Sequence, residues 1–256
     1  MNYKKKINEL RNKGFTILPN ILSKKECSNY IKIFDKIANK LEKKKSSIFS
    51  KCQFIDNPFR HNQKLVSLIH RKELDKIFFN LLDKNYVLID STIVNRKLRP
   101  NLKNGKRCKN AGNWHVDSRY LNNKRLEKGF SYVAITMFND FSNDNSAPLY
   151  VPKSHNRRDR PNRRGKYRGK ALIGKAGSIA IIDSGLWHKG GKSSKNNRWG
   201  AFNYYGPWFM KPYFDFPKMM GKKFSRKISK PIKKLLHYNS IPPINELIRS
   251  NTITKL

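Results

Sequence analysis

Apolar side chains along the chain recur first with a helical period and later with the alternation of strands. From Ser23 they return every three or four residues, and Glu26, three positions later, predicts a capping box at the start of this helix. The same spacing predicts a second helix over about 62–83. Residues 14–22 predict a short strand and a turn ahead of both helices. The N-terminal part of the chain is therefore expected to be mainly helical.

The pattern changes at Tyr86, where β-branched and aromatic residues become frequent. The predicted strands are short, are separated by turn residues, and cover 86–94, 115–117, 131–138, 149–151, 178–182 and 199–205. Strands of this kind are typical of a sandwich or barrel. Helices followed by strands predict an α+β chain, mainly β, with the N-terminal helices packed on one sheet.

The length of 256 residues fits one domain. We expect this domain to occupy residues 1–217 and to be followed by a basic C-terminal extension over 218–256. A helical appendage and a flexible tail are both open for the extension.

The compartment is predicted from what the sequence lacks. Its apolar runs are shorter than the roughly 20 residues that a membrane span needs, and the basic N-terminus has no apolar stretch of the signal-peptide kind. Cys27, Cys52 and Cys108 are odd in number and match no zinc spacing, which indicates reduced thiols. These features predict a soluble, cytoplasmic protein.

The charge balance is strongly basic, because 56 lysine and arginine residues stand against 17 acidic ones and give a formal net charge of +39. Much of this charge lies in a loop over 153–170 and in the segment after Lys218. Such a field attracts polyanions, so an anionic substrate, an anionic membrane and nucleic acid are all compatible partners. A general bias toward lysine and asparagine explains the same numbers, and both explanations stay open.

Two segments carry candidate metal ligands. His115 and Asp117 form a His-x-Asp, and residues two apart in a strand point to the same side. His188 follows some seventy residues later, and Arg198 comes ten positions after it. Two histidines and one carboxylate on one face of a metal are the ligand set of non-haem Fe(II) oxygenases. An arginine can clamp the carboxylate of an acid co-substrate through two parallel hydrogen bonds.

These residues belong to a longer pattern. Its segments are 14–15 with 22–26, Trp-His-Val-Asp at 114–117, 147–155, 177–178, and Leu-Trp-His at 186–188 with Arg198. Over roughly 10–216 the chain resembles the phytanoyl-CoA dioxygenase-like (PhyH) branch of the Fe(II)/2-oxoglutarate oxygenases. The resemblance implies a double-stranded β-helix, which is a cupin-like jelly roll.

The resemblance also implies roles for individual residues. His115, Asp117 and His188 would hold Fe(II), Arg198 would bind the far carboxylate of 2-oxoglutarate, and Asn95 would contact 2-oxoglutarate near the metal. The expected reaction uses O₂ to hydroxylate a C–H bond, with release of succinate and CO₂. Asp117 favours hydroxylation over halogenation, because halogenating relatives lack this carboxylate. The primary substrate, a small molecule or a lipid, stays open.

The chain departs from the family pattern at two positions. Gly190 stands where relatives often carry a hydroxyl residue, and the candidates for the missing contact to 2-oxoglutarate are Thr136, Ser193 and Tyr204. Lys153 stands at the glycine of the usual Pro-Gly-Ser-His, which predicts a different turn there.

Two other kinds of protein share some of these features. A polyanion-binding module that keeps the barrel without catalysis would be expected to have a broken triad, and here the triad is intact. A zinc-binding cupin-like protein also suits two histidines and a carboxylate. Arg198 at its fixed offset from His188 argues for an acid co-substrate and against the zinc alternative.

Overall fold

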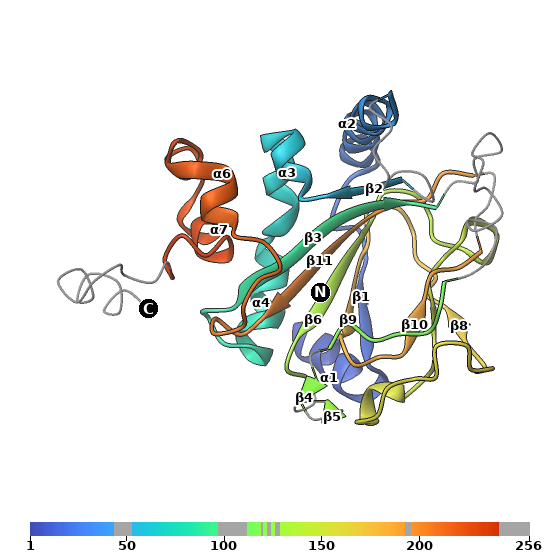
Figure 1. Cartoon of the computed structure of the whole chain (residues 1–256). Helices are drawn as coiled ribbons and strands as arrows, with labels where there is room; N and C mark the ends of the chain where they lie inside the picture. Colours follow the sequence, from blue (N-terminus) through green and yellow to red (C-terminus); the bar gives the residue numbers. More distant parts are fainter. Residues whose placement is uncertain are drawn as a thin grey trace.

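The protein is described from a computed structural model, which places residues 1–43, 53–96, 112–118, 120–121, 124–125, 129–192 and 196–240. The helices are α1 (Tyr3–Lys13), α2 (Lys24–Lys43), α3 (Pro58–His61), α4 (Lys72–Leu81), α6 (Phe216–Ser225) and α7 (Lys230–Leu235). Short 3₁₀ helices cover η2 (Gln63–Ile69), η3 (Asn143–Asn145) and η4 (Ser154–Asn156). Figure 1 shows the helices gathered on one side of a large curved sheet.

The large sheet is antiparallel throughout, and its strands belong to distant parts of the chain. Their order is β1 (Phe15–Leu18), β9 (Ile179–Asp183), β6 (Tyr132–Met137), β11 (Trp199–Gly206), β3 (Val87–Asn95) and β2 (Gln53–Asp56). The smaller antiparallel sheet consists of β10 (His188–Lys189), β7 (Leu149–Tyr150) and β8 (Lys170–Ala171). A separate hairpin pairs β4 (Tyr120–Leu121) with β5 (Lys124–Arg125).

The two faces of the large sheet belong to different cores. On β6, Tyr132 and Ala134 are part of the cluster shared with the N-terminal helices, whereas Val133, Ile135 and Met137 belong to a second cluster shared with Leu172 and Leu186. This division follows from the alternation of side chains along a strand. The second cluster is the interior of the jelly roll, so the predicted fold class is confirmed.

The start of the helix predicted from Ser23 is confirmed, and the helix predicted over about 62–83 is corrected. The Ser23 N–H donates to Glu26 Oε2 over 2.8 Å and the Glu26 N–H donates to Ser23 Oγ over 3.1 Å, which is the predicted capping box. The single helix expected over about 62–83 is wrong, because His70 and Arg71 are extended and separate η2 from α4. The His70 ring bonds Asp75 Oδ2 at 2.9 Å, and this contact holds the break at the start of α4.

Most predicted strands are found within one or two residues of their expected bounds, but residues 115–117 are an exception. Only His115 in this segment makes a backbone bridge, so it is an isolated contact instead of a regular strand. Beyond the jelly roll, α6 and α7 pack Phe216, Phe224, Leu235 and Leu236 into the main core. The division of the chain at residue 218 stays a prediction.

Within the described residues, no helix combines the length and the apolar character needed to cross a membrane. Cys27 is buried and free, and burial raises the pKa of its thiol. Cys52, Cys108 and Ser193, as well as most of the polar segment before Asn113, lie outside the described residues.

Candidate functional site

His115 and His188 face each other across an antiparallel backbone bridge. The His115 N–H donates to the His188 carbonyl oxygen and the His188 N–H donates to the His115 carbonyl oxygen, both over 2.9 Å. Residues paired in this way project their side chains to the same side, and the two imidazole centroids are 4.2 Å apart. One bridge therefore brings together histidines that are far apart in the sequence.

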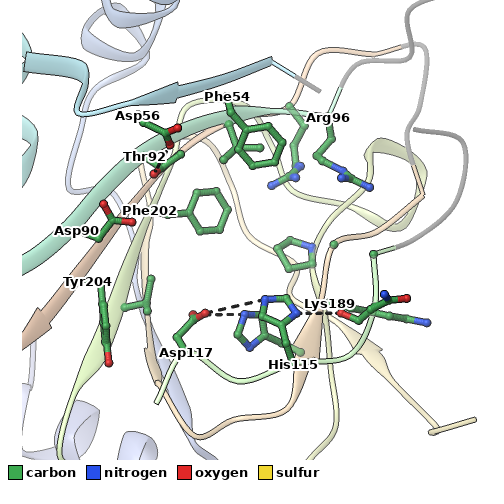
Figure 2. A pocket seen from close by; sticks show the side chains of 18 of the residues that line it. Phe54, Asp56, Asp90, Thr92, Arg96, His115, Asp117, Lys189, Phe202 and Tyr204 are labelled. Carbon is green, nitrogen blue, oxygen red and sulfur yellow. Dashed lines mark hydrogen bonds and ion pairs between the residues drawn. The ribbon is translucent and has the colours of Figure 1, made fainter. Parts of the chain in front are cut away.

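Asp117 completes the cluster from two residues further on. Its N–H and that of Ser118 both donate to the Ser184 carbonyl oxygen, over 2.9 and 3.0 Å. The Asp117 carboxylate lies 3.9 Å from His115 Nε2 and 3.4 Å from His188 Nε2. The possible ligand atoms of the three residues are all within 4.8 Å of one another, which is close enough for one metal ion. Figure 2 shows His115 and Asp117 side by side at one end of a cavity.

The hydrogen bonds on the far side of each ring prepare the two histidines for metal binding. His115 Nδ1 lies 2.9 Å from the Asn113 carbonyl oxygen, and His188 Nδ1 lies 2.8 Å from the Leu186 carbonyl oxygen. A carbonyl oxygen only accepts, so each Nδ1 carries the proton and each Nε2 presents a lone pair toward Asp117. The residues present therefore fit a divalent metal ion.

The electrostatics of the site favour a neutral His115. Burial lowers the pKa of this imidazole, and the adjacent His188 and the Arg163 guanidinium lower it further against the opposing effect of Asp117. A neutral imidazole is the form that binds metal.

Arg198 reaches the same cavity from the residue before β11. Its side chain is buried, with 2% of the residue exposed, and the guanidinium lies 4.6 Å from the centre of the Phe141 ring. The cavity has a volume of about 590 Å³ and is lined by the three candidate metal ligands together with Arg198. The structure therefore brings together the four residues that the sequence singled out first.

Asn95 and Thr136, the other two predicted contacts to 2-oxoglutarate, are not among the residues that line this cavity. The Asn95 side chain accepts from the Arg198 N–H over 3.0 Å and donates to Asn197 Oδ1 over 3.0 Å. Thr136 lies on β6 between Ala134 and Phe138, on the side that faces the helical core. Alternation along β3 and β6 turns both side chains away from the cavity, so the geometry does not support direct contact.

The alternation that removes Asn95 from the cavity places Arg96 in it, and sequence reasoning missed this residue. Arg96 lines the cavity, and its NH2 group donates to the Gly191 carbonyl oxygen over 2.7 Å. A Cβ atom at Gly190 would lie 3.3 Å from Arg96 Cζ. Gly190 stands where relatives often have a hydroxyl residue. The Arg96 guanidinium occupies the space beside it. Arg96 directly follows Asn95, so alternation places its side chain on the cavity side, whereas the resemblance had pointed to Asn95.

The same face of β3 is lined by acidic side chains at the end away from Arg96. Thr92 Oγ1 donates to Asp56 Oδ1 over 2.9 Å, and Asp90 lies on the same strand. Burial raises the pKa of Asp90 to about 6, with smaller contributions from the charges of Asp56 and Asp117 and an opposing hydrogen bond from Ser91. Figure 2 shows these carboxylates at the end of the cavity away from Arg96, with Phe202 between them and Arg96.

Tyr204 and Lys153, which the sequence singled out, and the nearby Asp183 and His155 have mainly structural contacts. Tyr204 lines the cavity, but its hydroxyl lies 3.0 Å from Ser131 Oγ. Asp183 accepts from the Gly185 N–H over 2.7 Å and from the Gly129 N–H over 3.1 Å, so it orders the turn before His188. The His155 ring bonds the Arg11 carbonyl oxygen at 3.0 Å and thereby ties its loop to α1. Lys153 has a φ of 60°, which is the left-handed conformation that glycine adopts without strain.

Positive side chains lie on the cavity wall near the candidate metal ligands. Arg163, from the basic loop 153–170, lines the cavity, and its carbonyl oxygen accepts from the Trp114 N–H over 3.1 Å. Lys189 also lines the cavity, with its Nζ 4.5 Å from the centre of the Trp114 ring. Trp114 and Trp187 are themselves buried and pack on Tyr167.

Solved structures of similar fold include proteins that bind 2-oxoglutarate or depend on it. HygX from Streptomyces hygroscopicus, solved with nickel and 2-oxoglutarate bound, has a TM-score of 0.64 at 12% identity over 84% of this chain and 90% of its own. The carbocyclase SnoK and the epimerase SnoN, both non-haem α-ketoglutarate-dependent enzymes from nogalamycin biosynthesis, have TM-scores of 0.61 and 0.60. Their identities are 17% and 12%, and each match covers 80% of this chain and 83% of theirs. A search of curated proteins found no significant match.

The jelly roll, with its His-x-Asp and distal histidine in one cavity, has the architecture of the non-haem iron oxygenases. The family model for phytanoyl-CoA dioxygenase (PhyH) matches residues 10–199. The chain belongs to this family, and the resemblance seen in the sequence is confirmed.

Proposed function

We propose that this protein is an Fe(II)- and 2-oxoglutarate-dependent oxygenase whose iron is held by His115, Asp117 and His188. The observation that carries the proposal is the backbone bridge between the two histidines, with both Nδ1 atoms bonded to carbonyl oxygens and both Nε2 atoms facing Asp117. Membership of the PhyH family and the bound 2-oxoglutarate in HygX support the same assignment.

Arg198 is proposed to bind the far carboxylate of 2-oxoglutarate. Its guanidinium is buried in the cavity wall, where a charge-assisted pair with a carboxylate is strong. Asn95 is proposed to position Arg198 by accepting its backbone N–H. Arg96 is proposed to supply a second positive contact to the co-substrate, in the place where relatives often have a hydroxyl.

The proposed reaction is hydroxylation of a C–H bond, with succinate and CO₂ as co-products. Bound iron supplies the oxidising chemistry from O₂ and 2-oxoglutarate, and the protein orients the substrate and excludes water. Structural neighbours that carry out carbocyclisation and epimerisation show that this fold also supports other outcomes. Identification of the product by mass spectrometry therefore decides between hydroxylation and its alternatives.

The substrate is proposed to carry a negatively charged group. Arg163 and Lys189 line the cavity, and the basic loop that contains Arg163 places further positive charge next to it. An anion entering there meets a favourable potential before it reaches the candidate metal site.

The activity is tested by succinate formation from 2-oxoglutarate in the presence of Fe(II) and O₂. We expect turnover by the wild type and its loss, by at least about a hundredfold, in Asp117→Ala. Asp56→Asn is the matched control, because Asp56 is a carboxylate of the same cavity outside the ligand set. Equal turnover by wild type and Asp117→Ala would rule the proposal out.

A further inference from the structure

Exposed aromatic side chains are concentrated in one loop. Seven large hydrophobic residues are exposed within the described part of the chain, and four of them lie between positions 208 and 214. Their exposed fractions are 47% for Trp208, 61% for Phe209, 51% for Tyr213 and 40% for Phe214. We call these four residues the aromatic ridge. It lies in the connection between β11 and α6, the orange segment in Figure 1.

The loop is anchored to the body of the protein, so its exposed side chains are held in place. Met210 is buried in the jelly-roll core, and Gly206 leaves space for it, since a Cβ there would lie 2.5 Å from Met210 Sδ. The Tyr213 N–H donates to the Ile89 carbonyl oxygen over 3.0 Å, and the Phe209 ring packs 5.8 Å from that of Phe130. The structure therefore presents the ridge to solvent as a fixed surface feature.

The ridge is continuous with the candidate active site. Tyr213 is exposed and also lines the cavity, where its ring centroid is 6.2 Å from that of Tyr204. A molecule bound against the ridge is thus next to an entrance of the cavity.

Positive charge surrounds the ridge in the sequence. Residues 207–240 contain nine lysine and arginine residues and a single acidic residue, Asp215. Lys211 lies within the loop, and Lys218, Lys222 and Lys223 on the following helix are exposed. Exposed tryptophan and phenylalanine side chains with nearby lysines are the combination that inserts into the headgroup region of an anionic bilayer.

We propose that the aromatic ridge docks this protein on the surface of a membrane that contains anionic lipids. The rings of Trp208 and Phe209 are perpendicular, at 90° with centroids 5.6 Å apart. A perpendicular pair does not present two parallel ring faces, as a platform for successive stacked bases would. The proposal does not depend on catalysis and can be tested with metal-free protein.

The test is sedimentation of the full chain with vesicles of phosphatidylcholine and phosphatidylserine, compared with pure phosphatidylcholine, at near-physiological salt. We expect binding to the mixed vesicles and at least about tenfold weaker binding by the double variant Trp208→Ser, Phe209→Ser. Ile173→Ser is the matched control, since Ile173 is 54% exposed and follows β8, which Figure 1 shows on the other side of the molecule from the β11–α6 connection. The control variant is expected to bind like the wild type.

Tryptophan fluorescence locates the contact in the same samples. Trp114, Trp187 and Trp199 are buried, with at most 2% exposed, so Trp208 is the solvent-exposed member of the four tryptophans. A blue shift of the emission on adding mixed vesicles, absent from Trp208→Phe, supports insertion of the ridge. Undiminished vesicle binding by the double variant would overturn the proposal, as would a failure of the wild type to bind. Binding of a single-stranded oligonucleotide that requires the ridge, without vesicle binding, would also overturn it.

Discussion

At the scale of single residues, the site depends on which atom of each side chain faces the cavity. The sequence identified His115, Asp117, His188 and Arg198 by residue type and spacing, and the structure brings all four together. The hydrogen bonds that select Nε2 as the free imidazole nitrogen come from backbone carbonyls, and no sequence pattern encodes them. Arg96 was missed because its role depends on the small residue at position 190, seen only in three dimensions.

Replacement of Arg96 tests the second contact to the co-substrate. We expect Arg96→Ala to raise the Kd for 2-oxoglutarate by at least about tenfold, because one charge-assisted hydrogen bond contributes about 1.5–3 kcal/mol. Fe(II) affinity measured without 2-oxoglutarate should stay unchanged. Arg160→Ala, at an exposed position of the basic loop, is the control. An unchanged Kd in Arg96→Ala would show that Arg96 serves only to support Gly191.

The raised pKa of Asp90 predicts that the stability of the protein depends on pH. Its pKa is raised to about 6 in the folded protein, whereas an unfolded chain has a value of about 3.9. The folded state binds the proton more tightly, so stability falls as pH rises from about 4 through about 6. Asp90→Asn removes this loss and should stabilise the metal-free protein at pH 7.5 by on the order of 1–2 kcal/mol, after allowance for solvent screening.

Urea unfolding at two pH values measures the effect of Asp90→Asn. The gain should be present at pH 7.5 and absent at about pH 4, where Asp90 is protonated in the folded state. Asp144→Asn is a control at an exposed carboxylate. A gain of the same size at both pH values would contradict the role given to the titration of Asp90.

At the scale of elements, the alternation of β3 and its pairing with β11 organise the site. The positions of the strands were predictable, because runs of β-branched and aromatic residues mark them clearly. Which face of each strand points into the cavity was not predictable. The predicted contact of Asn95 with 2-oxoglutarate rested on the family resemblance. In the structure Asn95 pairs with Trp199, and its side-chain amide faces the Arg198 backbone. The prediction of one helix over 62–83 was wrong, because the apolar period continues across His70 and Arg71 although their backbone is extended.

Asn95→Ala tests whether β3 positions Arg198. The buried Arg198 N–H loses its acceptor and Asn197 Oδ1 loses a donor, so the free energy of unfolding should fall by about 1–3 kcal/mol. The Kd for 2-oxoglutarate should rise severalfold, while Fe(II) binding stays unchanged. Thr136→Val serves as the comparison, since Thr136 faces the helical core and should leave 2-oxoglutarate binding intact. A large effect of Thr136→Val with none for Asn95→Ala would contradict the assigned orientations.

At the scale of the whole molecule, part of the positive charge lies around the candidate site. The basic loop reaches the cavity through Arg163, and the aromatic ridge reaches it through Tyr213. The sequence predicted the jelly roll and its helical side, because the order of helices and strands limits the possible layers. It did not predict how the surface charge and the exposed rings are arranged around one cavity, since that depends on contacts between distant loops.

Ionic strength tests whether the basic surface recruits an anionic substrate. Once a substrate is known, its KM should rise severalfold between low and high salt, because added ions screen the attraction. The kcat should change little, since buried contacts are screened less. A combined Arg158→Ser, Arg160→Ser variant, which lowers the charge of the loop, should reduce the salt dependence of KM. A KM that is independent of salt would favour compositional bias as the origin of the charge.

The central claim is that His115, Asp117 and His188 hold iron next to an Arg198 that binds 2-oxoglutarate. The most direct measurement is anaerobic titration of metal-free protein with Fe(II) and 2-oxoglutarate, recording the weak visible charge-transfer band of the chelate. We predict a band in the wild type, its loss in Asp117→Ala, and a shift to higher 2-oxoglutarate concentration in Arg198→Ala. A folded wild-type protein that gives no band would contradict the claim.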